Sequence, residues 1–248
     1  MKKVLVLIVC CLCSHLSFAE ISQKVAVKAT DFKKALYCAK DEEEINQIFK
    51  KYESTFDELL SDEERCFQKS VLLLERANFL QTEDNKKEFY YEFLKQRDTN
   101  VELIEAQKCT ADFYAISADI ISRLVNFSSG GELLRLSAKA KEYYLKAKKL
   151  DKKNFNASLG YGLWLYFAPS IAGGGFDSSI KEFSKSINNA KTDFDKYIAL
   201  IYRSQVYFKI TRVKNYEEDL KNAKDVLPDE SLITHIVEKN KNGKLFFE

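Results

Sequence analysis

The residues of this chain that could do acid–base or nucleophilic chemistry are few and widely spaced. Of its two histidines, His15 falls in an apolar N-terminal stretch and only His235 remains beyond it. A single histidine cannot form a two-histidine metal site. It could also activate at most one serine or cysteine nucleophile. The motifs Cys-x-x-Cys, Gly-x-Ser-x-Gly and His-Glu-x-x-His are also missing from the sequence. We therefore expect no enzymatic activity, no metal and no cofactor.

Carboxylates are abundant, and they cluster in two runs at 42–44 and 62–64. Both runs stand where we expect helices to begin, and the helix dipole favours negative charge at that end. Solvated helix starts explain them better than general acids or calcium ligands do. A helical hydrolase or lytic enzyme remains a third hypothesis, motivated by the carboxylates alone.

Three consecutive glycines, Gly173 to Gly175, precede an expected helix and could be taken for a phosphate cradle. No Lys-Ser or Lys-Thr follows them, the preceding element is helical, and Asp177 would place a negative charge beside the phosphate. We expect Asp177 to cap the next helix. A structural turn is the favoured interpretation.

The candidate binding residues are aromatic and surround this glycine segment. They are Tyr161, Trp164, Phe167, Pro169, Gly173, Gly174 and Phe176. Aromatic residues at helical spacing usually pack between helices, so each one has a core interpretation beside the functional one. The functional hypothesis is that Trp164, the only tryptophan, and Phe167 line a pocket under the Pro169 to Phe176 segment.

The elements that position these residues are helices with small and large apolar residues at helical spacing. One helix carries Ala140, Tyr144, Ala147 and Leu150, and the next carries Ala157, Gly160, Tyr161, Trp164 and Phe167 before Pro169 ends it. A third carries Phe176, Ser179, Phe183 and Ser186. These separations resemble those of the tetratricopeptide (TPR) repeat, with Lys152 standing where that family usually has proline.

A helix ending in Tyr-Phe-Ala-Pro at 166–169, followed by paired glycines and a new amphipathic helix, is more distinctive. It resembles the periplasmic T-component of TRAP transporters over roughly Leu133 to Leu227. The resemblance implies a pocket or pore for a small apolar ligand and a TRAP substrate-binding subunit as partner. The sequence departs from that pattern after Tyr216, where the helix is about a turn short.

Helix signals also fill the rest of the chain. Helices are expected over 21–40, 41–56, 61–80, 83–96, 99–127, 129–150, 193–207, 216–226 and 230–240, several opened by an Asp, Ser or Thr followed three residues later by Glu. The fold class is therefore all-α, built of stacked antiparallel helical hairpins as a TPR-like α-solenoid or a helical bundle. We divide it into N-terminal hairpins at 20–128 and TPR-like repeats at 129–248, with a Pro/Gly-rich insertion at 169–177.

The N-terminus predicts export. Lys2 and Lys3, an apolar run from Val4 to Leu16, and Ser-Phe-Ala before Glu20 are typical of a signal peptide spanning 1–19. The predicted location is periplasmic. A lipid anchor on Cys10 or Cys13 is the less favoured alternative, because neither cysteine has a well-formed acylation context.

Loss of residues 1–19 removes Lys2 and Lys3, which leaves 37 basic residues against 37 acidic ones. A neutral surface argues against a nucleic-acid partner, since phosphate binding needs a basic stripe. Three cysteines remain. Cys38 and Cys66 are the favoured disulfide pair in an oxidising compartment, and the alternative is three thiols packed as small apolar side chains with Cys109.

Together these features predict a non-enzymatic, exported TPR-like module that binds another periplasmic protein and a small apolar ligand. The alternative is an exported structural or envelope-assembly scaffold with no small-molecule ligand. Repeat folds of this kind form monomers or closed rings, and the sequence favours neither.

Overall fold

A computed structural model describes residues 21–56, 60–228 and 230–246. The predicted signal peptide, with Cys10 and Cys13, lies outside these residues. Within them the chain is all helical, as predicted. The helices are α2 (Gln23–Tyr37), α3 (Glu42–Glu53), α4 (Asp62–Leu80), α5 (Lys86–Ala106), α6 (Ala111–Val125), α7 (Gly130–Leu150), α8 (Phe155–Phe167), the short 3₁₀ turn η1 (Ser170–Ala172), α9 (Phe176–Asn189), α10 (Asp193–Lys209), α11 (Val213–Val226) and α12 (Glu230–Lys241).

Two predicted helix starts are confirmed by their capping bonds. The side chain of Asp41 accepts a hydrogen bond from the Glu44 amide at 2.8 Å, and Ser61 and Glu64 form a reciprocal capping box. Such bonds satisfy amide groups that have no partner inside the helix. Local sequence therefore fixes where α3 and α4 begin.

The predicted boundary between the fourth and fifth helices is wrong. Thr99 does not begin a helix but lies inside α5, where its hydroxyl donates to the Lys95 carbonyl at 3.0 Å. The chain breaks instead at 107–110, and Thr110 caps α6 by accepting from the Phe113 amide. The buried carboxylate of Glu63, on α4, accepts from the Thr110 amide at 2.8 Å. A hydrogen bond between residues 47 positions apart in the sequence thus stabilises the break between α5 and α6.

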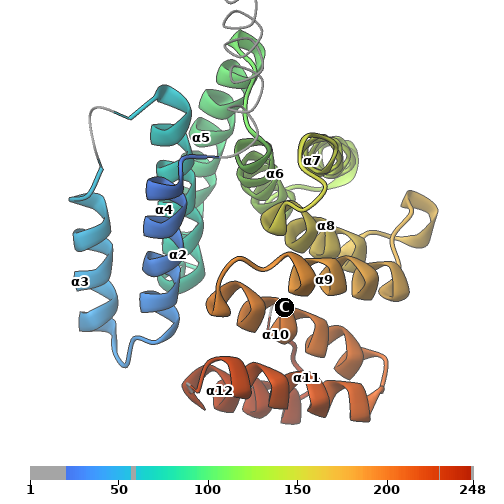
Figure 1. Ribbon diagram of the computed structural model, residues 1–248. Helices are drawn as coiled ribbons and strands as arrows, with labels where there is room; N and C mark the ends of the chain where they lie inside the picture. Colours follow the sequence, from blue (N-terminus) through green and yellow to red (C-terminus); the bar gives the residue numbers. More distant parts are fainter. Residues whose placement is uncertain (1–20, 57–59, 229, 247–248) are drawn as a thin grey trace, which may run out of the picture.

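From α6 onward the helices pack as consecutive antiparallel pairs, α6 with α7, α8 with α9 and α10 with α11 (Figure 1). The alternation of small and large residues explains the close packing. A Cβ added at Gly160 would lie 2.4 Å from the Tyr144 ring, and one added at Gly162 would lie 2.8 Å from the Phe183 ring. Both rings are buried, so each glycine makes room for an aromatic side chain of a neighbouring helix.

The division predicted at 128/129 falls inside one of these hairpins. The largest hydrophobic cluster runs from Ile21 in the N-terminal part to Ala140 and Tyr144 on α7. Near the other end, Tyr37 of α2 packs against Phe194 of α10, with ring centroids 5.8 Å apart. The two predicted parts therefore share one core in the described structure.

Candidate functional site

The segment between α8 and α9 folds back onto the end of α8. The Gly175 amide donates to the Leu165 carbonyl at 2.9 Å, and the Gly174 amide donates to the Pro169 carbonyl at 3.2 Å. A Cβ at Gly174 would lie only 1.8 Å from the Ala168 carbonyl oxygen, so no other residue fits there without a shift of the backbone. The glycines therefore hold a defined turn, as the structural interpretation predicted.

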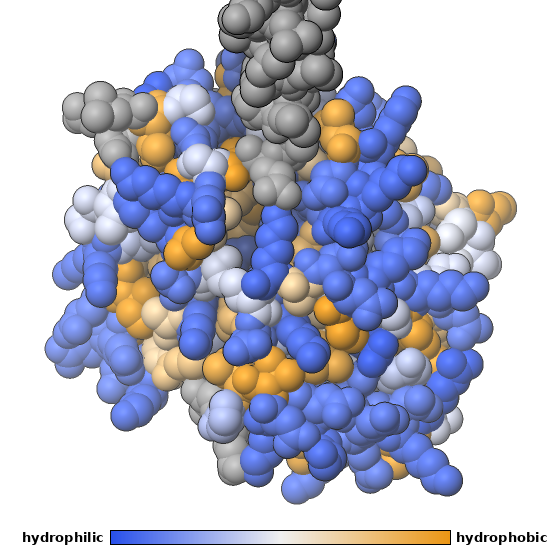
Figure 2. Space-filling view, viewed as in Figure 1, coloured by the Kyte–Doolittle hydropathy of each residue, from blue (hydrophilic) through white to orange (hydrophobic). Residues whose placement is uncertain are grey.

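This turn leaves apolar side chains in solvent. We call Phe167, Ile171 and Phe176 the loop tip. Their exposed fractions are 57%, 97% and 40%, and Ile171 is the most exposed of the large apolar side chains among the described residues. The loop lies at the right-hand edge of the molecule in Figure 1, and Figure 2 shows apolar colour at that edge. We treat these three exposed apolar side chains as the candidate contact surface of the segment.

Asp177 does not cap α9, contrary to the prediction. Gly175 occupies the N-cap position and Asp177 lies in the first turn, where it forms an ion pair with Arg212 at 3.1 Å. Arg212 immediately precedes α11. The ion pair therefore brings the α10–α11 turn beside the start of α9.

Tyr161 and Trp164 are half-buried, unlike the residues of the loop tip. Their rings stack at a centroid distance of 5.7 Å, and both pack against the largest hydrophobic cluster. The Trp164 indole N–H donates to the backbone carbonyl and hydroxyl of Ser137, at 3.0 Å each. Trp164 thus has the satisfied polar atom and the packing of a structural residue.

Two lysines of α7, seven residues apart, cover these rings. The Nζ of Lys141 lies 4.8 Å from the Trp164 ring centroid and donates to the Ala172 carbonyl at 3.0 Å. The Nζ of Lys148 lies 4.8 Å from the Tyr161 ring centroid. Lysine cations over aromatic faces are stabilising, and Lys141 also ties the loop to α7.

Glu182 on α9 completes the connection between α7 and α9. It is 7% exposed and pairs with both Lys148 and Lys185, the latter at 2.7 Å. Between these ties lies an open depression of about 500 Å³. We call it the α8–α9 groove, and its lining includes Tyr161, Leu165, Gly173, Ser178, Lys181, Glu182 and Lys185.

The predicted site residues therefore divide between two neighbouring surfaces. Tyr161 and Gly173 line the groove, while Phe167 and Phe176 belong to the loop tip. Pro169 and Gly174 shape the turn that separates them. Sequence reasoning missed Ile171, although an isolated isoleucine between Pro169 and Gly173 fits no helical core pattern. It also missed Lys141 and Lys148, whose spacing of seven places them on one helix face.

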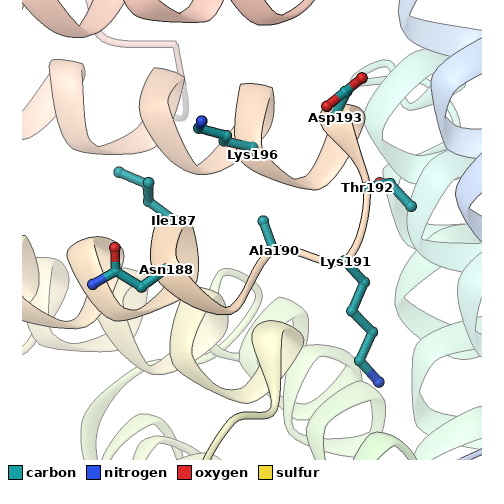
Figure 3. A pocket seen from close by; sticks show the side chains of 7 residues that line it. All are labelled: Ile187, Asn188, Ala190, Lys191, Thr192, Asp193 and Lys196. Carbon is teal, nitrogen blue, oxygen red and sulfur yellow. The ribbon is translucent and has the colours of Figure 1, made fainter.

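A second depression, of about 570 Å³, lies at the α9–α10 turn (Figure 3). Its lining is mostly polar. In Figure 3 Lys191 and Asp193 point in opposite directions, so the charged groups do not converge on one point. We assign no site there.

The strongest candidate for acid–base chemistry is Asp119, on α6. The Tyr144 hydroxyl donates to its Oδ1 at 2.6 Å, and burial raises the pKa of the Asp119 carboxyl to about 6. Oδ1 would lie 2.8 Å from a Cβ at Gly160, so a neighbouring helix closely covers this carboxylate. Asp119 borders neither depression, and we interpret it as a buried structural group.

The predicted Cys38–Cys66 disulfide is wrong. None of the three cysteines from Cys38 onward is disulfide-bonded in the structure. Cys38 follows the last residue of α2, whereas Ser22, at the other end of that helix, bonds to Glu64 two residues from Cys66. The 15 residues of α2 span about 22 Å, and a disulfide requires Cα atoms within about 7 Å.

Within the described ranges, no helix is both long and apolar enough to span a bilayer. The same residues contain no group of three or more His, Cys, Asp or Glu side chains placed to hold a metal ion. No protein-family model and no curated protein matches this chain. The loop tip and the groove are therefore the candidate functional surfaces of the described residues.

Proposed function

We propose that this chain is an exported, non-enzymatic, TPR-like module that binds a partner protein across the loop tip and the α8–α9 groove. The observation that carries the proposal is Ile171, 97% exposed on a turn that is held to α8 by the Gly175 amide and to α7 by Lys141. A rigid apolar projection needs little ordering when it binds, which favours association.

The charge beside the tip indicates the chemistry of the partner. Lys181 and Lys185 are exposed along the groove, and Glu182, which also lines it, already pairs with Lys148 and Lys185. A complementary surface would carry an apolar patch flanked by carboxylates. Such charge pairs steer association and weaken as salt is added.

The resemblance to TRAP T-components makes a TRAP substrate-binding subunit the first candidate partner. Trp164 gives no support to a small apolar ligand, because its indole N–H is bonded and its ring is packed against the core. The alternative function, an envelope-assembly scaffold without a small ligand, uses the same surface with a different partner.

Photocrosslinking in cells tests the docking surface. A benzophenone amino acid placed at Ile171 should crosslink to one defined periplasmic protein. The same probe at Val27, an apolar position on α2 that is 47% exposed, is the matched control. Mass spectrometry of the product then separates a TRAP substrate-binding subunit from an envelope component. Equal labelling from both positions, or labelling of lipid only, would contradict the proposal.

A binding measurement adds the energetics. Ile171→Asp should weaken the purified pair at least tenfold, since burying an isoleucine side chain is worth about 1.5–3 kcal/mol. Val27→Asp should leave the affinity unchanged. Unchanged affinity for both variants would remove the loop tip from the interface.

Native mass spectrometry of residues 20–248 tests the ligand separately. A small molecule that is bound to the wild type and released by Trp164→Ala would support ligand handling near the groove. Empty protein in both forms would favour the scaffold function.

A further inference from the structure

The segment after α12 returns to the centre of the molecule. α12 ends at Lys241, Gly243 turns the chain with a φ of 72°, and residues 244–246, which we call the tail, run inward (Figure 1). Leu245 is 1% exposed. It packs in a cluster with Tyr166 of α8, Phe183 of α9 and Val206 of α10. A non-helical segment therefore supplies a core side chain between three helices.

The backbone of the tail is bound by buried side chains. The Phe246 amide donates to Oε1 of Gln205 at 3.0 Å, and Nδ2 of Asn240 donates to the Lys244 carbonyl at 2.9 Å. Gln205 is fully buried and Asn240 is 4% exposed. These bonds go to main-chain atoms, so they would accept any extended segment that carries the same backbone.

Gln205 and Asn240 also hold each other in place. Nδ2 of Asn240 donates to Oε1 of Gln205 at 2.9 Å, and Nε2 of Gln205 donates to Oδ1 of Asn240 at 3.1 Å. The Tyr216 hydroxyl bonds to the same Oδ1 at 3.0 Å. These bonds fix the orientation of the two amide side chains. Removing the tail would leave each of them with one hydrogen bond fewer in the protein interior.

An aromatic ring follows the buried leucine. Phe246 packs against Tyr202 of α10 and Tyr37 of α2, at centroid distances of 5.9 and 6.4 Å. The tail therefore presents an aliphatic side chain and an aromatic side chain in succession, each with its own set of neighbours. We call the region that receives them the tail slot.

We propose that the tail slot is a peptide-binding site, which takes an extended segment of a partner protein with an aliphatic residue followed by an aromatic one. The tail occupies this site within the same chain, and the partner segment displaces it. An incoming segment would form the same backbone hydrogen bonds to Gln205 and Asn240, and its aliphatic side chain would pack where Leu245 packs. The number of hydrogen bonds and the buried apolar contacts would therefore be the same before and after the exchange. The inference does not depend on the loop tip.

A labelled peptide with the sequence Gly-Lys-Leu-Phe-Phe, that of residues 243–247, tests the proposal by fluorescence anisotropy. The full mature chain carrying Leu245→Ala and Phe246→Ala should bind the peptide at least tenfold more tightly than the wild type, because its own tail competes less. Adding Gln205→Leu to that variant should reduce binding at least tenfold. A peptide with Asp in place of Leu is the control and should not bind.

Hydrogen exchange of the wild type gives an independent test that needs no variant to fold. The Phe246 amide should exchange through a local opening, many times faster than the most protected amides of α10. Exchange of Phe246 only with global unfolding would overturn the proposal, since the tail could then not be displaced. Failure of the double variant to bind the peptide while retaining its helical circular dichroism would overturn it as well.

Discussion

At the scale of single residues, adding one Cβ atom produces a severe clash at some glycines of this protein and none at others. Gly174 accepts no Cβ because the Ala168 carbonyl occupies that space, whereas Gly131, on α7, has open space around the same position. Asp119 places a carboxyl group in the protein interior, where burial disfavours its ionised form.

Gly174→Ala should destabilise the protein by about 2–4 kcal/mol, because the loop must move away from α8 and lose its backbone bonds. Gly131→Ala is the matched control. It should be neutral or should stabilise by up to about 1 kcal/mol, since alanine lowers the entropy of the unfolded chain. Urea denaturation of both variants measures the difference, and equal stabilities would mean that the close approach at Gly174 is not maintained in solution.

Asp119→Asn should change how stability depends on pH. The folded pKa of about 6 lies above the unfolded value of 3.8, so the folded protein binds one more proton between about pH 4 and 6. Stability therefore falls as pH rises through that window, and the full cost of the ionised carboxylate is present above pH 6.

The asparagine variant stays neutral and still accepts the Tyr144 bond, so it should be more stable than wild type at pH 7.5, by on the order of 3 kcal/mol. This advantage should disappear near pH 4. Denaturation curves at several pH values check the trend, and a variant less stable than wild type at pH 7.5 would show that the carboxylate is not penalised.

At the scale of helices, ion pairs that cross between elements matter more than those within one helix. Arg203 of α10 makes two bonds to Asp219 of α11, at 2.9 and 2.6 Å, and a third to Ser184 of α9 at 2.8 Å. Asp219 is 2% exposed. Burial raises the pKa of the Asp219 carboxyl, and Arg203 opposes that rise.

Asp219→Ala should therefore cost about 3–5 kcal/mol, because it leaves the Arg203 guanidinium without its carboxylate among three packed helices. Asp225→Ala on the same helix is the control. Asp225 pairs with Lys221 in solvent, so its loss should change stability by less than about 0.5 kcal/mol. Thermal and urea unfolding of the two variants would show similar values only if the α10–α11 pair were solvent-accessible.

The elements also show what sequence patterns can and cannot predict. Helical periodicity and local caps predicted the all-α class and the starts of α3 and α4, because those signals lie within a few residues of one another. The α5–α6 break depends on Glu63, 47 residues before Thr110, so the local signal at Thr99 was misleading. The exposure of Ile171 was missed for the same reason, since it depends on how the loop folds back. The positions of Lys141 over Trp164 and of Lys148 over Tyr161 depend in the same way on how α7 lies on α8.

At the scale of the whole molecule, the N-terminal helix α2 contacts α10 and the tail, which lie far from it in the sequence. A row of hairpins that contact only their neighbours can unfold in stages. Here Tyr37 of α2 contacts Phe79 of α4, Phe194 of α10 and Phe246 of the tail, with centroid distances of 5.3, 5.8 and 6.4 Å. Elements far apart in sequence therefore meet at one side chain, which favours a single cooperative unfolding transition.

Tyr37→Ala should disrupt that cooperativity as well as lower stability. We expect a loss of about 3–5 kcal/mol from the missing ring and the cavity it leaves. Because the lost contacts join α2 to α10 and the tail, the C-terminal hairpins should then unfold before the N-terminal helices, giving two transitions where the wild type gives one. Tyr91→Ala, at a position 56% exposed on α5, provides the control and should keep one transition with nearly unchanged stability.

Calorimetry combined with hydrogen exchange distinguishes one unfolding transition from two. One transition in Tyr37→Ala, shifted to lower temperature, would mean that the shared core around α6 and α7 is enough to couple the two ends without Tyr37.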